Sequence, residues 1–318
     1  LDTSRAEKEF GFKAKTDLAP EQDLIGLYGD ERIIIDRNSA FIGTDIVAAT
    51  FFMLTRWEEI AIQDRDKHGR FVEEKSLAIK HGFHKRPIVN EYAEFLWNVL
   101  QKLGYPENRK MKKFQFYPTH DIDFLFKYDG FLKCAKVLTG DLVKRKSLSV
   151  FRNSVNSIYS IKSKKSADVF DTFDFLMDVS ESKGLKSFFY FMSGVRGETD
   201  VDFSITDRRV VSKIEQIIKR GHVVGIHPTY NSFDDILQFK LELSRLRKIS
   251  SDIYEGRQHF LRFQNPKTWQ IWNDSGLKMD STIGFYSTIG FRAGICCEYP
   301  VFNVETGKVL DLLERPLV

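Results

Sequence analysis

The sequence predicts an α/β fold with a parallel sheet that is either open or closed into a barrel. After about residue 112, short apolar or aromatic runs alternate with longer helical segments, which is the pattern of consecutive β/α units. The chain has 318 residues, of which 42% are hydrophobic, enough for two domains of ~150 residues each. A polar and basic stretch at residues 105–112 predicts the boundary. We expect a smaller N-terminal α/β domain over residues 1–110 and a larger domain over residues 111–318.

The N-terminal domain is predicted to contain two helices after a charged, loop-like start at residues 1–20. Both carry recognisable end signals, a polar cap or a first-turn proline before the apolar run and a glycine after it. The helices and their end residues are 44–61 (capped by Thr44 or Asp45) and Pro87–Leu103 (ended by Gly104). No motif in this domain indicates a chemical role, so we expect an accessory domain whose function stays open.

The larger domain is predicted to alternate strands with helices. The expected strands are 114–119, 185–192, 222–227, 257–263, 277–279 and one that starts at 315–318. The expected helices are a long insertion at 130–164, then 168–182, 207–220, 233–249 and one that begins at Pro266. In such folds the active groups lie at the carboxyl ends of the strands. Asp121, Asp123 and His227 follow predicted strands and are therefore candidate site residues.

The first candidate motif is His120-Asp121-Ile122-Asp123, which follows a run with alternating aromatics. On an extended strand the two aspartates share one face and His120 lies on the other. Two carboxylates on one face repel each other unless a cation or a shared proton offsets the repulsion. The alternative is structural: the acid pair caps the next segment or pairs with lysines.

The second candidate motif is the segment from Gly221 to Asn231, in which a short apolar strand ends at His227 before Pro228. A histidine at a strand end in an α/β run is a candidate metal ligand. A lone histidine is equally expected as a polar group that is satisfied by hydrogen bonds, and both interpretations stay open.

Two arginine-containing stretches complete the candidates. On a strand over 257–263, Arg257 and His259 share one face, and an arginine beside a carboxylate lowers its pKa and orients it. Downstream, the strand-end acid Asp280 precedes a loop in which Arg292 is flanked by glycines. The alternative for the two arginines of the first stretch, Arg257 and Arg262, is an ordinary surface ion pair.

Taken together, the motifs resemble those of the polysaccharide deacetylase superfamily (carbohydrate esterase family 4 and relatives). The resemblance covers about residues 112–303 and rests on the order and spacing of Thr-His-Asp-Ile-Asp, Gly-His-Val-Val-Gly-Ile-His-Pro-Thr-Tyr and Gly-Phe-Arg-Ala-Gly-Ile-Cys. It is similar to a bacterial branch that carries an extra N-terminal domain. The resemblance implies an irregular, incomplete (β/α) barrel and a metal-dependent hydrolase that removes N-acetyl or O-acetyl groups from a surface polysaccharide, an oligosaccharide or a precursor.

The resemblance also implies roles for individual residues. Asp121 would be the general base and Arg257 or Arg292 would hold it ionised. A divalent cation would polarise the acetyl carbonyl and lower the pKa of a water from 15.7 toward ~7. His259 is the candidate acid for the leaving amine, because the unperturbed pKa of histidine, ~6.5, suits that role. Backbone N–H groups near Tyr230 are candidates for holding the oxyanion.

The metal ligands implied by the resemblance are Asp123, His227 and Asn231, and the expected metal is zinc, with cobalt, nickel and manganese as alternatives. The family pattern has a histidine where this chain has Asn231, and an asparagine oxygen is a poorer partner for zinc. His259 or His120 is the alternative source of the missing nitrogen. The family also has a late histidine, but no histidine follows His259 here, so we expect either a barrel truncated at its C-terminal end or His259 in place of the late histidine.

Composition limits the partners. A net charge of +4 on 318 residues does not make a nucleic-acid footprint, and no apolar run is long enough to span a bilayer. The three cysteines predict reduced thiols and a cytoplasmic location rather than a disulfide framework. Basic clusters at 144–146 and 162–165 are expected as solvated faces, or else as sites that attract anionic lipid-linked substrates or a membrane surface. The oligomeric state is open.

The alternatives to the enzyme are a catalytically impaired relative, which binds glycan or scaffolds polysaccharide assembly, and a different amide or ester hydrolase on the same fold.

Overall fold

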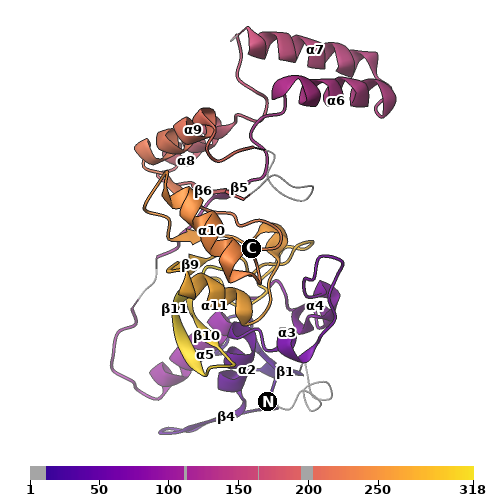
Figure 1. The fold of residues 1–318 in the computed structure, drawn as a ribbon. Coiled ribbons are helices and arrows are strands. Elements are labelled where there is room, and N and C mark those ends of the chain that lie inside the picture. Colours follow the sequence, from indigo (N-terminus) through magenta and orange to yellow (C-terminus); the bar gives the residue numbers. More distant parts are fainter. Residues whose placement is uncertain (1–11, 111–112, 164, 195–202) are drawn as a thin grey trace. The chain divides into compact units, whose positions relative to one another are not determined.

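The computed structural model describes residues 12–110, 113–163, 165–194 and 203–318, which divide into two compact units. Unit 1 comprises residues 1–114, 230–240 and 254–318, and unit 2 comprises residues 115–229 and 241–253. The fold class is mixed α/β, as predicted, and both units contain parallel strands (Figure 1). No described helix combines the length and the apolar character that crossing a membrane requires.

Unit 2 is built on three parallel strands in the order β7-β6-β5. They are β5 (Thr119–Ile122), β6 (Phe188–Phe191) and β7 (Val223–Ile226). All four side chains of β6 are buried, and α8 (Phe173–Ser182) and α9 (Arg208–Lys219) each bury apolar residues at helical spacing. A central strand that is buried throughout is typical of a parallel sheet whose faces are covered.

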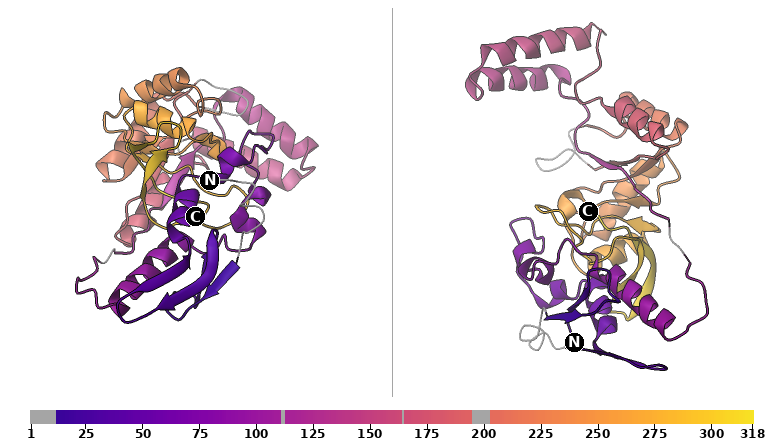
Figure 2. Two further views of the ribbon diagram at one scale, coloured as in Figure 1. Left: turned by 90° about the horizontal axis from the view of Figure 1, so that it is seen from below. Right: turned by 180° about the vertical axis from the view of Figure 1, so that it is seen from behind.

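The predicted helical insertion of unit 2 is a pair of helices, α6 (Gly130–Val143) and α7 (Leu148–Lys162). Figures 1 and 2 show them side by side, joined at one end by the short turn at residues 144–147. The last part of α10 (Ile236–Arg247) also belongs to unit 2.

Four strands of unit 1 are paired in the order β10-β11-β9-β8. They are β8 (Glu255–Gly256), β9 (Met279–Asp280), β10 (Tyr299–Asn303) and β11 (Lys308–Glu314). The strands β8, β9 and β11 are mutually parallel, whereas β10 and β11 form an antiparallel hairpin. The helix α11 (Lys267–Asp274) buries both of its tryptophans, which anchors it in the core of the unit.

The N-terminal part of unit 1 consists of antiparallel hairpins and helices. The strands are β1 (Phe12–Lys15), β2 (Asp23–Gly26), β3 (Gly29–Ile35) and β4 (Ala40–Thr44). The helices are α2 (Ile46–Leu54), α3 (Glu58–Ala61), α4 (Leu77–Lys80), α5 (Ile88–Lys102) and the 3₁₀ turn η1 (Glu73–Lys75). Asp45 caps α2 by accepting a hydrogen bond of 2.8 Å from the Ala48 N–H, which confirms the predicted cap.

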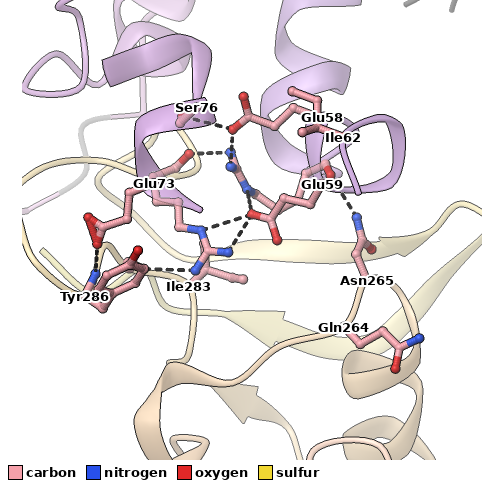
Figure 3. Close-up of polar contacts among 12 residues, drawn as sticks. Glu58, Glu59, Ile62, Glu73, Ser76, Gln264, Asn265, Ile283 and Tyr286 are labelled. Carbon is pink, nitrogen blue, oxygen red and sulfur yellow. Dashed lines mark hydrogen bonds and ion pairs between the residues drawn. The ribbon is translucent and has the colours of Figure 1, made fainter. Parts of the chain in front are cut away.

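A buried ionic network lies inside unit 1 (Figure 3). Glu59 accepts hydrogen bonds from Arg56 at 2.9 Å and from Arg292 at 3.0 and 2.7 Å, and all three side chains are at most 4% exposed. Glu58 pairs with Arg56 and accepts from Ser76 at 3.1 Å. The network therefore joins residues before position 80 to the loop that carries Arg292.

Several predicted elements are wrong. Residues 114–118 are irregular, and Phe114 is 91% exposed, so the first strand of the larger domain begins only at Thr119. The segment 257–263 holds a 3₁₀ turn instead of a strand, because Phe260 and Leu261 have positive φ angles. The helix 44–61 is interrupted at Arg56, which has φ of 52°. Residues 315–318 are irregular, and the last strand, β11, precedes them.

Candidate functional site

Two predicted ligands of unit 2 come together at the carboxyl end of its sheet. Ile122, Phe191 and Ile226 are aligned across the three strands, so Asp123 and His227 are the first residues beyond β5 and β7. The Nε2 atom of His227 lies 3.4 Å from Oδ1 of Asp123. Since β6 separates the two strands, which places them about 9.6 Å apart at the usual spacing, both side chains must reach across the end of β6 to meet.

The pair differs in exposure. The His227 side chain is 2% exposed, whereas that of Asp123 is 41% exposed. An imidazole nitrogen and a carboxylate oxygen are both ligands that zinc accepts. The pair is therefore one wall of a candidate metal site, with the carboxylate on the side that solvent reaches.

The other two polar residues of the first motif, His120 and Asp121, follow one another along β5. The Nε2 atom of His120 lies 3.2 Å from the Ser187 hydroxyl, and its ring stacks on Phe189 at 4.8 Å. Asp121 is exposed and, with Asp123, lines a surface pocket of about 420 Å³. His120 lines the same pocket, so the alternation of side chains along β5 does not separate it from Asp121 at this edge of the sheet.

Aromatic and acidic side chains share the lining of this pocket. Phe124 and Phe170 are 59% and 40% exposed, and their ring centroids lie 6.3 Å apart. Asp168 holds this wall in place, because its carboxylate accepts hydrogen bonds of 3.0 Å from the N–H groups of Lys127, Tyr128 and Phe170. Nothing in the sequence around Asp168 indicated this role, since its partners are mostly about 40 residues away.

The loop after His227 is fixed by a buried carboxylate. Glu242 of α10 is fully buried and accepts hydrogen bonds from the N–H of Thr229, at 2.8 Å, and from its hydroxyl. A side chain on Gly194 would clash with Thr229, because a Cβ there would lie 2.1 Å from its Cγ2. Glu242 therefore positions the loop that follows a proposed ligand, and sequence analysis did not identify it.

The predicted residues of the third motif lie in unit 1. Arg257 is buried and donates to the Ser281 carbonyl at 2.9 Å and to the Ser281 hydroxyl at 3.0 Å. His259 is 6% exposed and begins the 3₁₀ turn whose next two residues are left-handed. A positive φ is uncommon outside glycine, so this turn is a specifically built feature that orients His259.

Asn231 also lies in unit 1, and its side-chain oxygen already has a cationic donor. Arg262 donates to Asn231 Oδ1 at 3.3 Å and also donates to the carbonyl of Tyr230. Its guanidinium lies 3.9 Å from the ring centroids of both Tyr230 and Phe233. Because the oxygen that would bind a metal faces a fixed positive charge, Asn231 is a weaker ligand candidate than His259.

Arg292 belongs to the buried network of unit 1. Its Nε and Nη2 atoms donate to Glu59, and its Nη1 donates to the Gly284 carbonyl at 3.0 Å. Burial by itself would raise the pKa of Glu59, but Arg292 and Arg56 beside it hold that pKa below its usual value. Of the two arginines predicted to orient Asp121, Arg292 is committed to Glu59, and Arg257 is the remaining candidate.

Near Arg257 lie two buried acids, on two strands that are far apart in the sequence. Asp280 and Glu314 are aligned on the parallel strands β9 and β11, and both are fully buried. Trp269 donates to Glu314 at 3.0 Å, and the Thr282 hydroxyl donates to Asp280. Burial raises the pKa of Asp280 to about 7 and also raises the pKa of Glu314. Glu314 was not predicted, because its partner is more than 30 residues away.

Comparisons with known proteins bear on one part of the chain. A family model described as a family of unknown function (DUF7033) matches residues 7–105. No curated protein and no solved structure matches the chain. The matched segment ends before Asp121, so it carries no information about the chemistry of the candidate site.

Proposed function

We propose that the protein is a metal-dependent hydrolase that removes acetyl groups from a glycan, with N-acetylated sugars as the first substrates to test. The observation that carries this proposal is the contact between Asp123 and His227 at the carboxyl end of the unit 2 sheet. A second acid, Asp121, lines the same pocket as Asp123. The acid and the imidazole supply two ligands for a divalent cation, and the second acid beside them can accept a proton from water.

The residues fit a divalent cation by their chemistry. Asp123 supplies a carboxylate oxygen and His227 an imidazole nitrogen, which suits zinc, cobalt or nickel. For a third ligand the sequence offers Asn231 and His259. We favour His259, because it is an imidazole on a specially shaped turn and because Arg262 donates to the oxygen of Asn231.

The chain's own groups then have distinct roles. When bound, a divalent cation supplies polarisation of the acetyl carbonyl. Asp121 accepts the proton of the attacking water, and a histidine protonates the departing amine. If His259 is the third ligand, it is not available as this acid, so the two roles proposed for His259 are alternatives. The exposed rings of Phe124 and Phe170 offer apolar surface against which a sugar ring can pack.

The second candidate function is a glycan-binding relative without hydrolytic activity. The observation that favours it is Asn231, which stands where the resembled family has a histidine and whose oxygen accepts a hydrogen bond from Arg262. Such a protein would keep the pocket beside Asp121 and Asp123 but hold metal weakly.

Two measurements test the proposal together. Purified protein is analysed for bound metal, and acetate release is measured from N-acetylglucosamine oligomers with zinc, cobalt or nickel added. We expect about one equivalent of metal and metal-dependent acetate release. Binding of the oligomers without metal and without acetate release would establish the second candidate instead, and neither binding nor hydrolysis would contradict both for this substrate class.

A further inference from the structure

The pair of helices α6 and α7 concentrates positive charge. Residues 130–165, here called the basic hairpin, contain nine Lys or Arg and a single Asp, although the whole chain carries only +4. The single acid, Asp141, is fully buried, where the Ser154 hydroxyl and then the Arg145 guanidinium hold its pKa below the usual value. The exposed charges that the structure describes on the basic hairpin are therefore all positive.

The same hairpin exposes large apolar side chains. Phe131, Leu132 and Val143 of α6 are 81%, 82% and 71% exposed, and Leu148 and Tyr159 of α7 are 78% and 65% exposed. These side chains are not scattered singly, because they share two adjacent helices (Figure 1). Several large apolar side chains exposed on two adjacent helices are a feature of interaction surfaces.

Apolar and basic residues alternate along each helix at the spacing of one helical face. In α7 the exposed positions Leu148, Arg152, Val155, Tyr159 and Lys162 follow one another at intervals of three or four residues. In α6, Leu132, Lys136 and Val143 lie on one face in the same way. Each helix therefore presents a face that is both apolar and cationic.

The hairpin does not bury a core of its own. In the described part of α6 and α7, the only buried residues are Cys134, Asp141 and Ser154. The large apolar side chains on the inner faces of the helices, such as Leu138 and Ile158, are only half-buried. Asp141 of α6 accepts a hydrogen bond of 2.7 Å from the Ser154 hydroxyl of α7, which ties the two helices together. The exposed apolar side chains are not covered by the rest of the hairpin.

We propose that the basic hairpin docks on the surface of an anionic lipid bilayer. A helix with apolar residues on one face and lysines and arginines around them lies in the interface of a membrane, where the rings and aliphatic chains enter the acyl boundary and the cations meet lipid phosphates. A nucleic acid would satisfy the cations through its phosphates but would leave Phe131, Leu132, Val143 and Leu148 in water. The combination of charge and exposed apolar residues therefore favours the lipid surface, independently of the hydrolase proposal.

The test is a flotation assay with the full chain and two kinds of vesicle, one of phosphatidylcholine alone and one of phosphatidylcholine mixed with phosphatidylglycerol. We expect the protein to float with the anionic vesicles and to remain unbound with the neutral ones. Binding to the anionic vesicles should weaken as salt is added, because the surface attraction is screened. Failure to bind anionic vesicles, or equal binding to both kinds, overturns the proposal.

Three variants locate the surface. K144Q/K146Q/R152Q removes three exposed cations from the hairpin, and binding should weaken by about a hundredfold at the usual contribution of a surface lysine or arginine. V143S/L148S keeps the charge and should weaken binding by more than about tenfold through lost apolar burial. The matched control, K183Q/K186Q/K219Q, removes the same charge from exposed positions of unit 2 outside the hairpin and should bind like the unaltered chain.

The outcomes are distinct. If the hairpin variant K144Q/K146Q/R152Q and the control variant K183Q/K186Q/K219Q weaken vesicle binding equally, the binding depends only on the net charge of the chain. That result would overturn the proposal. A single-stranded RNA oligomer serves as the competing probe, and binding of the RNA in the absence of vesicle binding would also overturn it. Circular dichroism of each variant checks that the helices persist, and the unaltered chain alone already decides between anionic and neutral vesicles.

Discussion

The Nε2 atom of His227 lies 3.4 Å from Oδ1 of Asp123, although the two residues follow strands that β6 separates. The contact depends on the register of the sheet, in which β5, β6 and β7 end at the same level. A shift of one residue in β7 would turn His227 to the opposite face of the sheet. Glu242 adds to this by fixing the backbone of Thr229, two residues further along. A metal site built on this contact would be preorganised by the sheet and not by a loop alone.

The first prediction concerns the proposed base. Replacement of Asp121 by Asn keeps the shape of the side chain and removes its ability to accept a proton, so acetate release should fall by about 10² to 10⁴-fold, the usual contribution of a general base. Bound metal should persist, because Asp121 is not among the proposed ligands. Acetate release and metal content are measured on the same preparation.

The control for Asp121 is Asp252→Asn, which removes a carboxylate from an exposed position of the same unit. This variant should keep both activity and metal. Loss of metal in Asp121→Asn would instead make Asp121 a ligand, and full activity would exclude it as the base.

The second prediction separates the candidates for the third ligand. His259→Ala should weaken zinc binding by at least about tenfold, because an imidazole nitrogen is lost from a site with few ligands. Asn231→Ala should leave zinc binding unchanged, because its oxygen accepts a hydrogen bond from Arg262. Competitive titration with a chromophoric chelator measures both affinities, and the reverse ranking would restore Asn231 as the ligand.

The sequence correctly predicted those features that depend only on neighbouring residues, such as the starts of helices. The cap Asp45, the helix that starts after Pro87 and the helix that follows Asp207 are all confirmed, because helix start signals involve residues only a few positions apart. Local sequence rules failed at 257–263, where alternation suggested a strand. There Phe260 takes a left-handed conformation and packs against His68 and Tyr230, which are far away in sequence. Contacts of this kind override a local pattern and leave no periodic signal.

The candidate site shows the same division. The positions of Asp121, Asp123 and His227 near the carboxyl ends of β5 and β7 could be predicted, because strand ends follow a local pattern, and their chemical roles remain predictions. The groups that support them could not: Glu242 and Asp168 are ordinary acids in helical and loop segments, and Arg292 looked like a site residue because a glycine-flanked arginine has no local partner. In the structure that partner is Glu59, which is 233 residues away.

The third prediction concerns this buried network. Replacement of Glu59 by Gln leaves Arg56 and Arg292 buried without their shared counter-charge, which typically costs about 3–5 kcal/mol in the free energy of unfolding. Urea denaturation measures this loss. Glu74→Gln, at an exposed position of the same segment, is the matched control and should change stability by less than about 0.5 kcal/mol.

A double variant tests whether the loss at Glu59 comes from the unpaired charge. Glu59→Gln combined with Arg292→Met removes one charge of each sign, so it should be less unstable than the sum of the two single variants. Simple additivity would show that the two residues stabilise unit 1 independently, contrary to their contacts at 2.7 and 3.0 Å.

The fourth prediction is a pH dependence of stability that arises from the buried acids Asp280 and Glu314. Burial raises the pKa of Asp280 from 3.8 to about 7, with Glu314 beside it on the neighbouring strand. Between these values the folded protein keeps a proton that the unfolded chain has released. Stability is therefore greatest below the unfolded pKa and falls as pH rises through the folded pKa, by at most about 1.4 kcal/mol per pH unit for one proton.

Asp280→Asn should reduce this slope, because the amide cannot release a proton and because the charge of Asp280 no longer adds to the burial that raises the pKa of Glu314. Urea denaturation at a series of pH values from about 5 to 7 measures the slope. Asp311→Asn, at an exposed position on β11, should retain the slope of the unaltered chain. An unchanged slope in Asp280→Asn would assign the pH dependence to other groups, of which Glu255, also buried and with a raised pKa, is the next to replace.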